Sequence, residues 1–346
     1  MQYSRPPDRV RETLLWVTRT RYERRFPLNS SKFTIGTLAV VMLVVLRITI
    51  GWHFFYEGVW KIANADKFST TPFLVQAKGP AAELFYAMVY DIDGRQRLAA
   101  EKDEEGNTVR GRIYTDAWKA LVEKVEVKYK LSEEQLAEAQ ELYDRYEASI
   151  EDYLEENAED IEAYFGSLER FEPSKNEGNF GAPFQKKRRW NRQQELRAEV
   201  NGWLAELDGM QEDFHKALWN VLDEDQKAKG PLPVAWERED LMNVMMTYGL
   251  TAIGFCMMVG LCTRLASLGG AVFLINVLLT QPPWPTIYPP APAVVGHALI
   301  VDKNFVEMVA MVTLATLPVG RWGGLDYFLH HWFGRPLLAW LGRPID

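Results

Sequence analysis

Cysteine is scarce in this chain, which has two cysteines in 346 residues, Cys256 and Cys262. They are six residues apart, about 240° around a helix, so the two thiols would point in different directions. No C-x-x-C pair is present, and residues 64–239 contain no cysteine at all. Internal disulfide staples, zinc ribbons and thioredoxin-like redox chemistry are therefore excluded for this chain.

Charge is nearly absent from residues 34–52, an apolar run whose one ionisable side chain is Arg47. Three further apolar segments follow residue 240. An apolar helix of about 20 residues spans the ~30 Å hydrocarbon layer of a bilayer, because its backbone polar groups are satisfied internally. The chain is thus predicted to be an integral membrane protein, although its mean hydropathy of −0.21 would suit a soluble one.

The predicted fold is all-α, an integral membrane four-helix bundle with spans at residues 33–63, 240–262, 264–282 and 296–320. The proline-rich loop after the third span cannot continue a helix, because proline lacks the N–H donor. The fourth span contains Asp302, Lys303 and Glu307 and is therefore less apolar than the other three.

Basic residues near the predicted spans indicate their orientation. Residues 1–32 hold eight Lys and Arg against three acidic residues, Arg264 lies between spans two and three, and Arg321, Arg335 and Arg343 follow span four. Under the positive-inside rule these regions face the cytoplasm, including an amphipathic tail at 321–346. This predicts a multi-pass protein of the bacterial inner membrane. Ala63-Asn64-Ala65 has the A-x-A pattern of a cleavage site, but the preceding run is too long for a signal peptide, so an uncleaved anchor is expected.

Residues 64–239, the middle segment, are acidic, with 38 Asp and Glu against 24 Lys and Arg. The rest of the chain has 9 Asp and Glu against 15 Lys and Arg. This contrast predicts an extracytoplasmic insert between spans one and two, and it makes nucleic acid an implausible partner. Asp91-Ile92-Asp93-Gly94 faintly resembles a calcium loop, but the other ligand positions are missing, so a plain turn is the better interpretation.

The middle segment is predicted to be helical, with a coiled-coil hairpin at about 132–222. Ser132 and Gln135 form a capping box that starts a helix reaching about Phe171. A second helix, from about 185 to 222, has apolar residues at alternating spacings of three and four: Leu196, Val200, Trp203, Leu207, Met210, Phe214, Ala217 and Val221. That is the seam of an antiparallel coiled coil. Residues 114–131 could pack alongside as a third helix.

A basic cluster, residues 186–189, lies beside Trp190 near the tip of this hairpin. As a functional site it would bind an acidic partner or lipid headgroups. As a structural feature it is a solvated helix start that faces the acidic first helix, and this second interpretation is favoured.

Ionisable side chains inside hydrocarbon are expensive, so they are paired or functional. In the first span Arg47, Gly51, Phe54, Gly58 and Lys61 share one helix face, whose glycines allow a neighbouring helix to approach closely. Glu57 and Lys61 are four residues apart and are expected to pair. The first span is net positive and the fourth net negative, which predicts an Arg47–Glu307 ion pair in the bundle core.

A polar pocket open to lipid-soluble ligands is predicted in the outer half of the bundle. Its candidate residues are Arg47, Glu57, Lys61 and Glu307 as catalytic groups, with His53, Asn276, Gln281, His297, Asp302 and Lys303 as ligand-binding groups. The alternative is that these charges only lock helix packing, as buried pairs often do. Haem held by His53 and His297 is a weaker option, since no C-x-x-C-H is present. No metal site is predicted.

The first span contains the pattern L-R-x-x-x-G-x-x-F-x-x-E-G-x-x-K from Leu46 to Lys61, and residues 320–326 read GRWGGLD. Both, together with the layout of one span, an outward loop and three further spans, resemble the DoxX/DoxD-like membrane family. The resemblance implies a compact four-helix membrane bundle and a part in quinone-linked sulfur or thiol oxidation, since DoxD-like proteins are subunits of thiosulfate:quinone oxidoreductase. The long middle segment departs from the short loop of that family, which favours docking to another protein.

Two functional hypotheses follow. In the first, the chain is a DoxX-like subunit of a redox complex, with quinone as the one cofactor considered. Arg47 and Lys61 would stabilise a reduced quinone or a sulfur anion, and Glu57 or Glu307 would relay protons. In the second, it is a non-catalytic membrane scaffold or receptor whose hairpin, with Tyr143 and Trp190, docks a partner protein on the outward side. A transporter is a weaker option. A homo-oligomer is compatible with either hypothesis.

Overall fold

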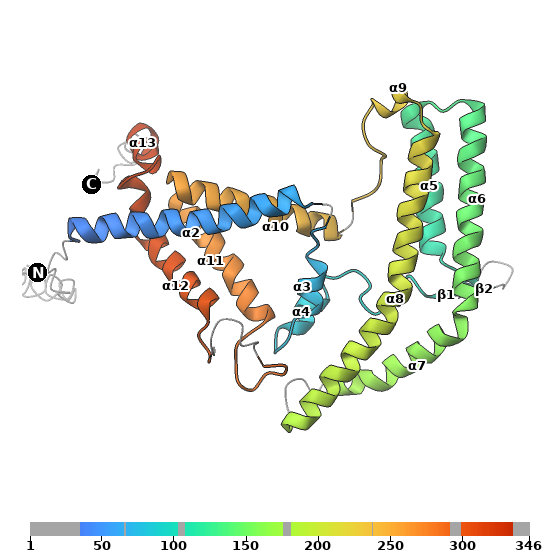
Figure 1. Ribbon diagram of the computed structural model, residues 1–346, viewed down its shortest axis with the longest axis horizontal. Helices are drawn as coiled ribbons and strands as arrows, with labels where there is room; N and C mark the ends of the chain where they lie inside the picture. Colours follow the sequence, from blue (N-terminus) through green and yellow to red (C-terminus); the bar gives the residue numbers. More distant parts are fainter. Residues whose placement is uncertain are drawn as a thin grey trace, which may run out of the picture.

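The computed structural model describes residues 35–65, 67–102, 108–175, 181–236, 238–290 and 299–334, and it is mostly helical. Figure 1 shows two parts. The first, here called the bundle, contains α2 (Thr37–Ala63), α10 (Arg238–Val259), α11 (Thr263–Thr280) and α12 (Lys303–Thr316). The second, here called the helical domain, contains α5 (Arg112–Tyr129), α6 (Glu133–Glu156), α7 (Ala158–Lys175) and α8 (Pro183–Val221). Two short helices, α3 (Thr71–Val75) and α4 (Ala82–Tyr86), lie between them.

Three helices of the bundle, α2, α10 and α11, are long and apolar enough to cross a membrane. The ends of these three helices lie within four residues of the ends of the first three predicted spans. Large apolar side chains on their outer faces are exposed, for example Leu38 (77%), Trp52 (58%) and Leu265 (72%). A soluble protein rarely exposes so much contiguous apolar surface, whereas lipid would cover it.

The fourth helix of the bundle, α12, is shorter than the predicted span 296–320. Its 14 residues extend about 21 Å at 1.5 Å per residue, less than the ~30 Å hydrocarbon layer. It begins at Lys303 because the Asp302 carboxylate caps it, accepting a hydrogen bond from Phe305 N at 2.8 Å. It ends before Leu317, which is extended and precedes Pro318 and the 3₁₀ turn η1 (Val319–Arg321). Residues 296–298 lie outside the described residues.

The closest helix contact in the bundle is a glycine seam between α2 and α10. A Cβ added to Gly58 would lie 2.5 Å from Thr251 N, and one added to Gly254 would lie 2.6 Å from Gly51 O. The two backbones therefore touch, as small residues permit in membrane helices. The expected close approach at Gly51 and Gly58 is confirmed, and α10 is the neighbour.

The helical domain matches the predicted hairpin with one difference. The capping box at Ser132 and Gln135 is confirmed, and α8 buries the predicted seam residues Leu196, Val200, Leu207, Phe214 and Val221. The predicted first helix, 132–171, is instead two helices, because Asn157 interrupts it. The Asn157 side chain donates to Tyr153 O at 2.8 Å and so ends α6, after which α7 bends toward the start of α8 (Figure 1).

The core of the helical domain is aromatic, and α5 completes it as the third helix. Trp118 of α5 is 1% exposed and stacks on Phe214 of α8 with ring centroids 4.8 Å apart. Tyr146 of α6 packs edge-on against both rings. A short antiparallel hairpin, β1 (Ala100–Lys102) with β2 (Thr108–Arg110), leads into α5. It was not predicted, since three-residue strands are too short to show an alternating pattern.

The helical domain stands crosswise to the bundle, with α8 running across the direction of α2 (Figure 1). Arg197 of α8 connects the helical domain to α3 and α4. Its guanidinium donates to Val75 O at 2.5 Å and lies 3.9 Å from the centre of the Tyr86 ring. At the other end of α8, the helix α9 (Glu224–Lys227) starts the return to α10.

Candidate functional site

Arg47 is the most buried charged side chain of the bundle, with 1% exposure. Its guanidinium donates to three backbone carbonyls: Val319 O at 3.2 Å, Gly323 O at 3.0 Å and Met258 O at 3.5 Å. These carbonyls lie near the ends of α10 and η1, and Val319 O also accepts a hydrogen bond from Trp322 N at 3.2 Å. The predicted Arg47–Glu307 ion pair is wrong, because the Arg47 guanidinium binds these carbonyls and Glu307 pairs with His53.

The GRWGGLD residues surround Arg47. A Cβ added to Gly324 would lie 2.6 Å from Gly260 Cα and 2.8 Å from Arg47 Nη1. Asp326 is the first residue of α13 (Asp326–Leu329). Its carboxylate accepts hydrogen bonds from Cys262 N at 2.6 Å and Thr263 N at 2.9 Å. It thereby caps the beginning of α11. The two patterns on which the family resemblance rests thus form one contact, which fastens the chain after α12 to the α10–α11 turn.

His53 is the partner of Glu307. Their Nδ1 and Oε1 atoms are 2.9 Å apart, and the pair links α2 to α12. The His53 side chain is 59% exposed on the outside of the bundle, whereas that of Glu307 is 18% exposed. The imidazole thus lies on the outer surface of the bundle, and the carboxylate is mostly covered.

Glu57 and Lys61 form the expected pair, with Nζ 2.9 Å from Oε2. The Lys61 ammonium also lies 5.3 Å from the centre of the Phe68 ring. The pair sits at the end of α2 nearest the helical domain (Figure 1). Glu57 lies one helical turn after His53 on α2.

The remaining candidates have local roles. Asn276 donates to Val272 O of its own helix at 2.8 Å, and Asp302 caps α12. Lys303 is exposed and Gln281 half-buried, and His297 lies outside the described residues. The structure thus divides the predicted pocket into separate contacts: it brings together His53 with Glu307 and Glu57 with Lys61, and it places Arg47 elsewhere.

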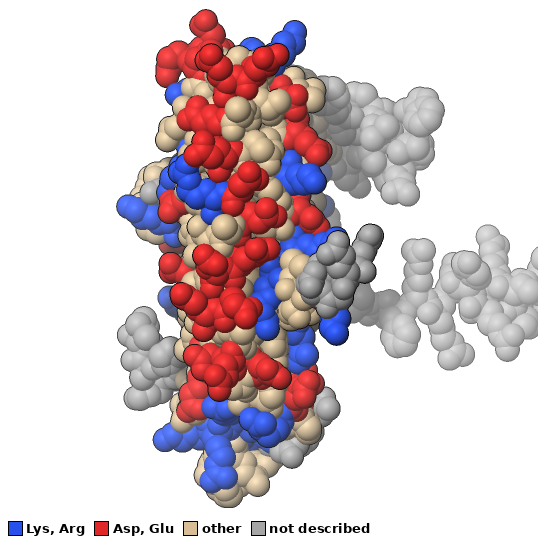
Figure 2. Space-filling view, turned by 90° about the vertical axis from the view of Figure 1, so that its right-hand side faces the viewer, with Lys and Arg blue, Asp and Glu red and all other residues tan. Residues whose placement is uncertain are grey.

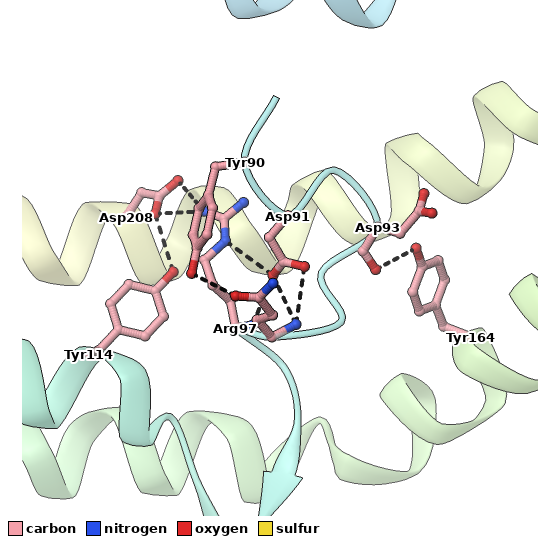
Figure 3. Close-up of polar contacts among 8 residues, drawn as sticks. Tyr90, Asp91, Asp93, Arg97, Tyr114, Tyr164 and Asp208 are labelled. Atoms are coloured by element: carbon pink, nitrogen blue, oxygen red, sulfur yellow. Dashed lines mark hydrogen bonds and ion pairs between the residues drawn. The ribbon is translucent and has the colours of Figure 1, made fainter. Parts of the chain in front are cut away.

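A polar network missed by the sequence analysis joins the helical domain to the segment before it (Figure 3). Arg97 donates to both Asp208 carboxylate oxygens, at 3.1 and 3.2 Å, and its Nε lies 3.6 Å from Asp91 Oδ2. Tyr114 donates to Asp208 at 3.3 Å. Burial and the adjacent Asp208 carboxylate raise the pKa of the Tyr114 phenol well above its usual range. The contacts of Asp208 with Arg97 and Tyr114 join segments more than 90 residues apart, which no local pattern could have revealed.

The predicted turn at Asp91–Gly94 is confirmed. Gly94 N donates to Asp91 O at 2.9 Å, and Gly94 has the left-handed φ of 68° that favours glycine. The Asp91 carboxylate accepts from Gln96 N and Arg97 N. Its oxygens are therefore occupied by donors, and no group of three or more potential metal ligands is found within the part of the chain that the structure describes.

Comparisons with protein-family models, with curated proteins and with solved structures find no match. The DoxX/DoxD-like resemblance therefore stays a prediction. The structure thus offers a buried Arg47 contact, an exposed histidine–carboxylate pair, and a large helical domain with its own core.

Proposed function

We propose that this protein is a membrane-anchored scaffold whose helical domain docks a protein partner through an acidic face. In this proposal α12 and the apolar residues beside it form a fourth, short span. Both termini are cytoplasmic in a bacterial inner membrane, and the middle segment is the extracytoplasmic insert. The bundle then serves to hold the helical domain at a constant position above the lipid.

The acidic face of α6 and α7 is the observation that carries this proposal. α6 contains ten carboxylates and one cation, Arg145. Nine of the ten residues are exposed, and Glu147 is half-buried. Figure 2 shows acidic side chains over most of the length of the surface that faces away from the bundle, with basic side chains near its lower end and along its sides. A surface on which acidic groups predominate attracts and orients a basic partner.

The carboxylates of α6 repel one another. A surface without a binding role would be expected to carry fewer charges of one sign side by side. Burial and the neighbouring Glu147 and Asp152 charges raise the pKa of Glu151. Arg145 pairs with Glu141 at 3.2 Å, on the same helix. A basic partner would relieve this repulsion on binding.

Single-cysteine cross-linking in intact cells tests the proposal. Both probes are made in a background in which Cys256 and Cys262 are replaced by Ala. Ser149→Cys places one thiol at an exposed position of α6, and Val127→Cys places a control thiol at an exposed position of α5. We expect Ser149→Cys to react with a membrane-impermeant maleimide and to form one cross-linked product, whereas Val127→Cys reacts without that product. Neutralising Glu138, Glu141, Asp152 and Glu155 to their amides should abolish the product.

Two outcomes would contradict the proposal. Labelling only in disrupted cells would place the helical domain in the cytoplasm. A cross-linked product that persists when the four carboxylates are neutralised would remove the acidic face as the docking surface.

A second candidate function rests on the His53–Glu307 pair. A quinone-linked role would have this pair supply the protons that accompany two-electron reduction of a quinone, with a sulfur compound such as thiosulfate as the electron donor. Purified protein with thiosulfate and a short-chain quinone tests it, using His53→Gln against the exposed control Lys303→Gln. Quinone reduction that is lost only in His53→Gln supports the role, and the absence of any reduction removes it.

A further inference from the structure

A pocket lies between the start of α8, the segment that carries α3 and α4, and the loop after α11. Its lining includes three cations, Lys78, Lys186 and Arg189, and four aromatic residues, Tyr86, Phe171, Trp190 and Tyr288. Glu83 is the carboxylate among the lining residues. The excess of positive charge, in a chain segment that is acidic overall, points to an anionic ligand.

Lys78 is the innermost cation of the pocket and is 6% exposed. Its backbone N donates to Thr280 O at 2.8 Å, which fixes it to the end of α11, and its Nζ donates to Pro289 O at 2.8 Å. An ammonium carries three donors. Burial lowers the pKa of Lys78, because it removes water from the ammonium. A bound anion would compensate for that lost hydration.

Two residues of the basic cluster face the pocket and two do not. Lys186 and Arg189 are three residues apart on one side of α8 and are half-buried among the lining residues, whereas Lys187 and Arg188 are exposed. Lys186 Nζ donates to Thr286 O, in the loop after α11, at 2.7 Å. Both lie in the first two turns of α8.

The pocket adjoins the end of α11 and the loop that follows it. The contact of Lys78 with Thr280 ties the segment that carries α3 and α4 to the end of this apolar helix, which is long enough to cross a membrane, and the contact of Lys186 with Thr286 ties the start of α8 to the loop (Figure 1). In the proposed placement of the bundle, this loop lies at the membrane surface. Tyr and Trp residues gather at this depth in membrane proteins. We propose that this pocket binds the phosphate group of an anionic lipid headgroup, with Lys78, Lys186 and Arg189 as its ligands. The inference rests on the proposed placement of the bundle in the membrane, not on the partner of α6.

Native mass spectrometry of the detergent-solubilised full chain tests the site, with phosphatidylglycerol compared to phosphatidylcholine. We expect Lys186→Gln/Arg189→Gln to lower phosphatidylglycerol retention about tenfold or more, since charge-assisted contacts to phosphate are lost. The matched control Lys187→Gln/Arg188→Gln has the same change of charge on the same helix and should retain the lipid. Equal loss in both variants, or no preference for phosphatidylglycerol, would overturn the proposal.

Two further measurements keep the test decisive. Inorganic phosphate is added to delipidated protein; binding of phosphate that lipid cannot displace would assign the pocket to a free anion and refute the lipid assignment. Photoactivatable phosphatidylglycerol is applied to the unaltered protein, so the result does not depend on a variant that folds. Labelling of the peptides containing Trp190 or Tyr288 supports the site, and labelling only elsewhere contradicts it. Cross-linking at Ser149→Cys reports separately on the scaffold role.

Discussion

The bundle and the helical domain each shield an arginine from solvent, and they satisfy it in different ways. Arg47 in the bundle donates to backbone carbonyls, whereas Arg97 at the base of the helical domain pairs with the carboxylates of Asp91 and Asp208. The two parts also differ in how their helices pack against one another. The bundle combines an apolar core with glycines that let backbones touch, and the helical domain depends on large aromatic rings. The comparison shows that close backbone packing adds to hydrophobic burial among helices that are long and apolar enough to cross a membrane.

The largest expected effect separates the two parts energetically. Trp118→Ala removes the ring that stacks on Phe214 and should destabilise the helical domain by about 4 kcal/mol, leaving the bundle folded. Limited proteolysis of the purified protein should cleave α5–α8 and spare α2, α10 and α11. Val127→Ala, on the same helix but 78% exposed, is the control. Simultaneous loss of both parts would show that they fold as one unit.

A glycine substitution tests how the helices of the bundle pack. Gly254→Ala forces a methyl group against the α2 backbone and should cost about 3 kcal/mol, seen as a lower melting temperature and aggregation in detergent. Gly249→Ala adds the same methyl to α10 where no atom lies within 4 Å. It should be neutral or slightly stabilising, and similar behaviour of the two variants would remove the glycine seam as a packing device.

Arg47→Met tests whether the buried arginine of the bundle is structural. It removes the donors to Gly323 O and Met258 O and one of the two donors to Val319 O, and it should destabilise the protein by about 2 kcal/mol. Arg264→Gln removes a charge from the exposed start of α11 and should change the melting temperature little. An unaltered melting temperature for Arg47→Met would contradict the structural role.

A double-mutant cycle measures the corresponding contact outside the bundle. Arg97→Met and Asp208→Asn should be coupled by about 1 kcal/mol, a modest value because the Asp208 side chain is 56% exposed. Denaturant unfolding of the four proteins gives the coupling. Additive effects would show that the network in Figure 3 contributes no specific energy.

The smallest effect is a pH dependence confined to the helical domain. Burial lowers the pKa of His215 below its ordinary 6.5, with Glu212 partly opposing the shift. Between the lowered value and 6.5 the unfolded state binds more protons, so stability falls as the pH drops through this window. Thermal unfolding of the helical domain should therefore be less acid-sensitive in His215→Gln than in the unaltered protein. Equal acid sensitivity would contradict the shift.

Parts of the candidate site were predictable and parts were not. Glu57 with Lys61 followed from helix periodicity, since residues four apart face each other on any helix. Charge balance between spans correctly indicated that Glu307 needs a partner in α2, yet it named Arg47 instead of His53. Both lie on α2, and only the placement of α12 against it decides which one Glu307 reaches. The role of GRWGGLD around Arg47 had no local signal, because its contacts join residues more than 200 positions apart.

By itself, the sequence determined the helices. Long apolar runs, glycine spacing, the capping box at Ser132 and the seam of α8 each depend on residues within a few turns of one another, and local hydrogen bonding and burial suffice to specify them. The tertiary structure alone decided which helices touch, where α6 gives way to α7, and which cations of the 186–189 cluster meet Lys78. These outcomes depend on contacts between distant segments, whose energies arise only when the whole chain has packed.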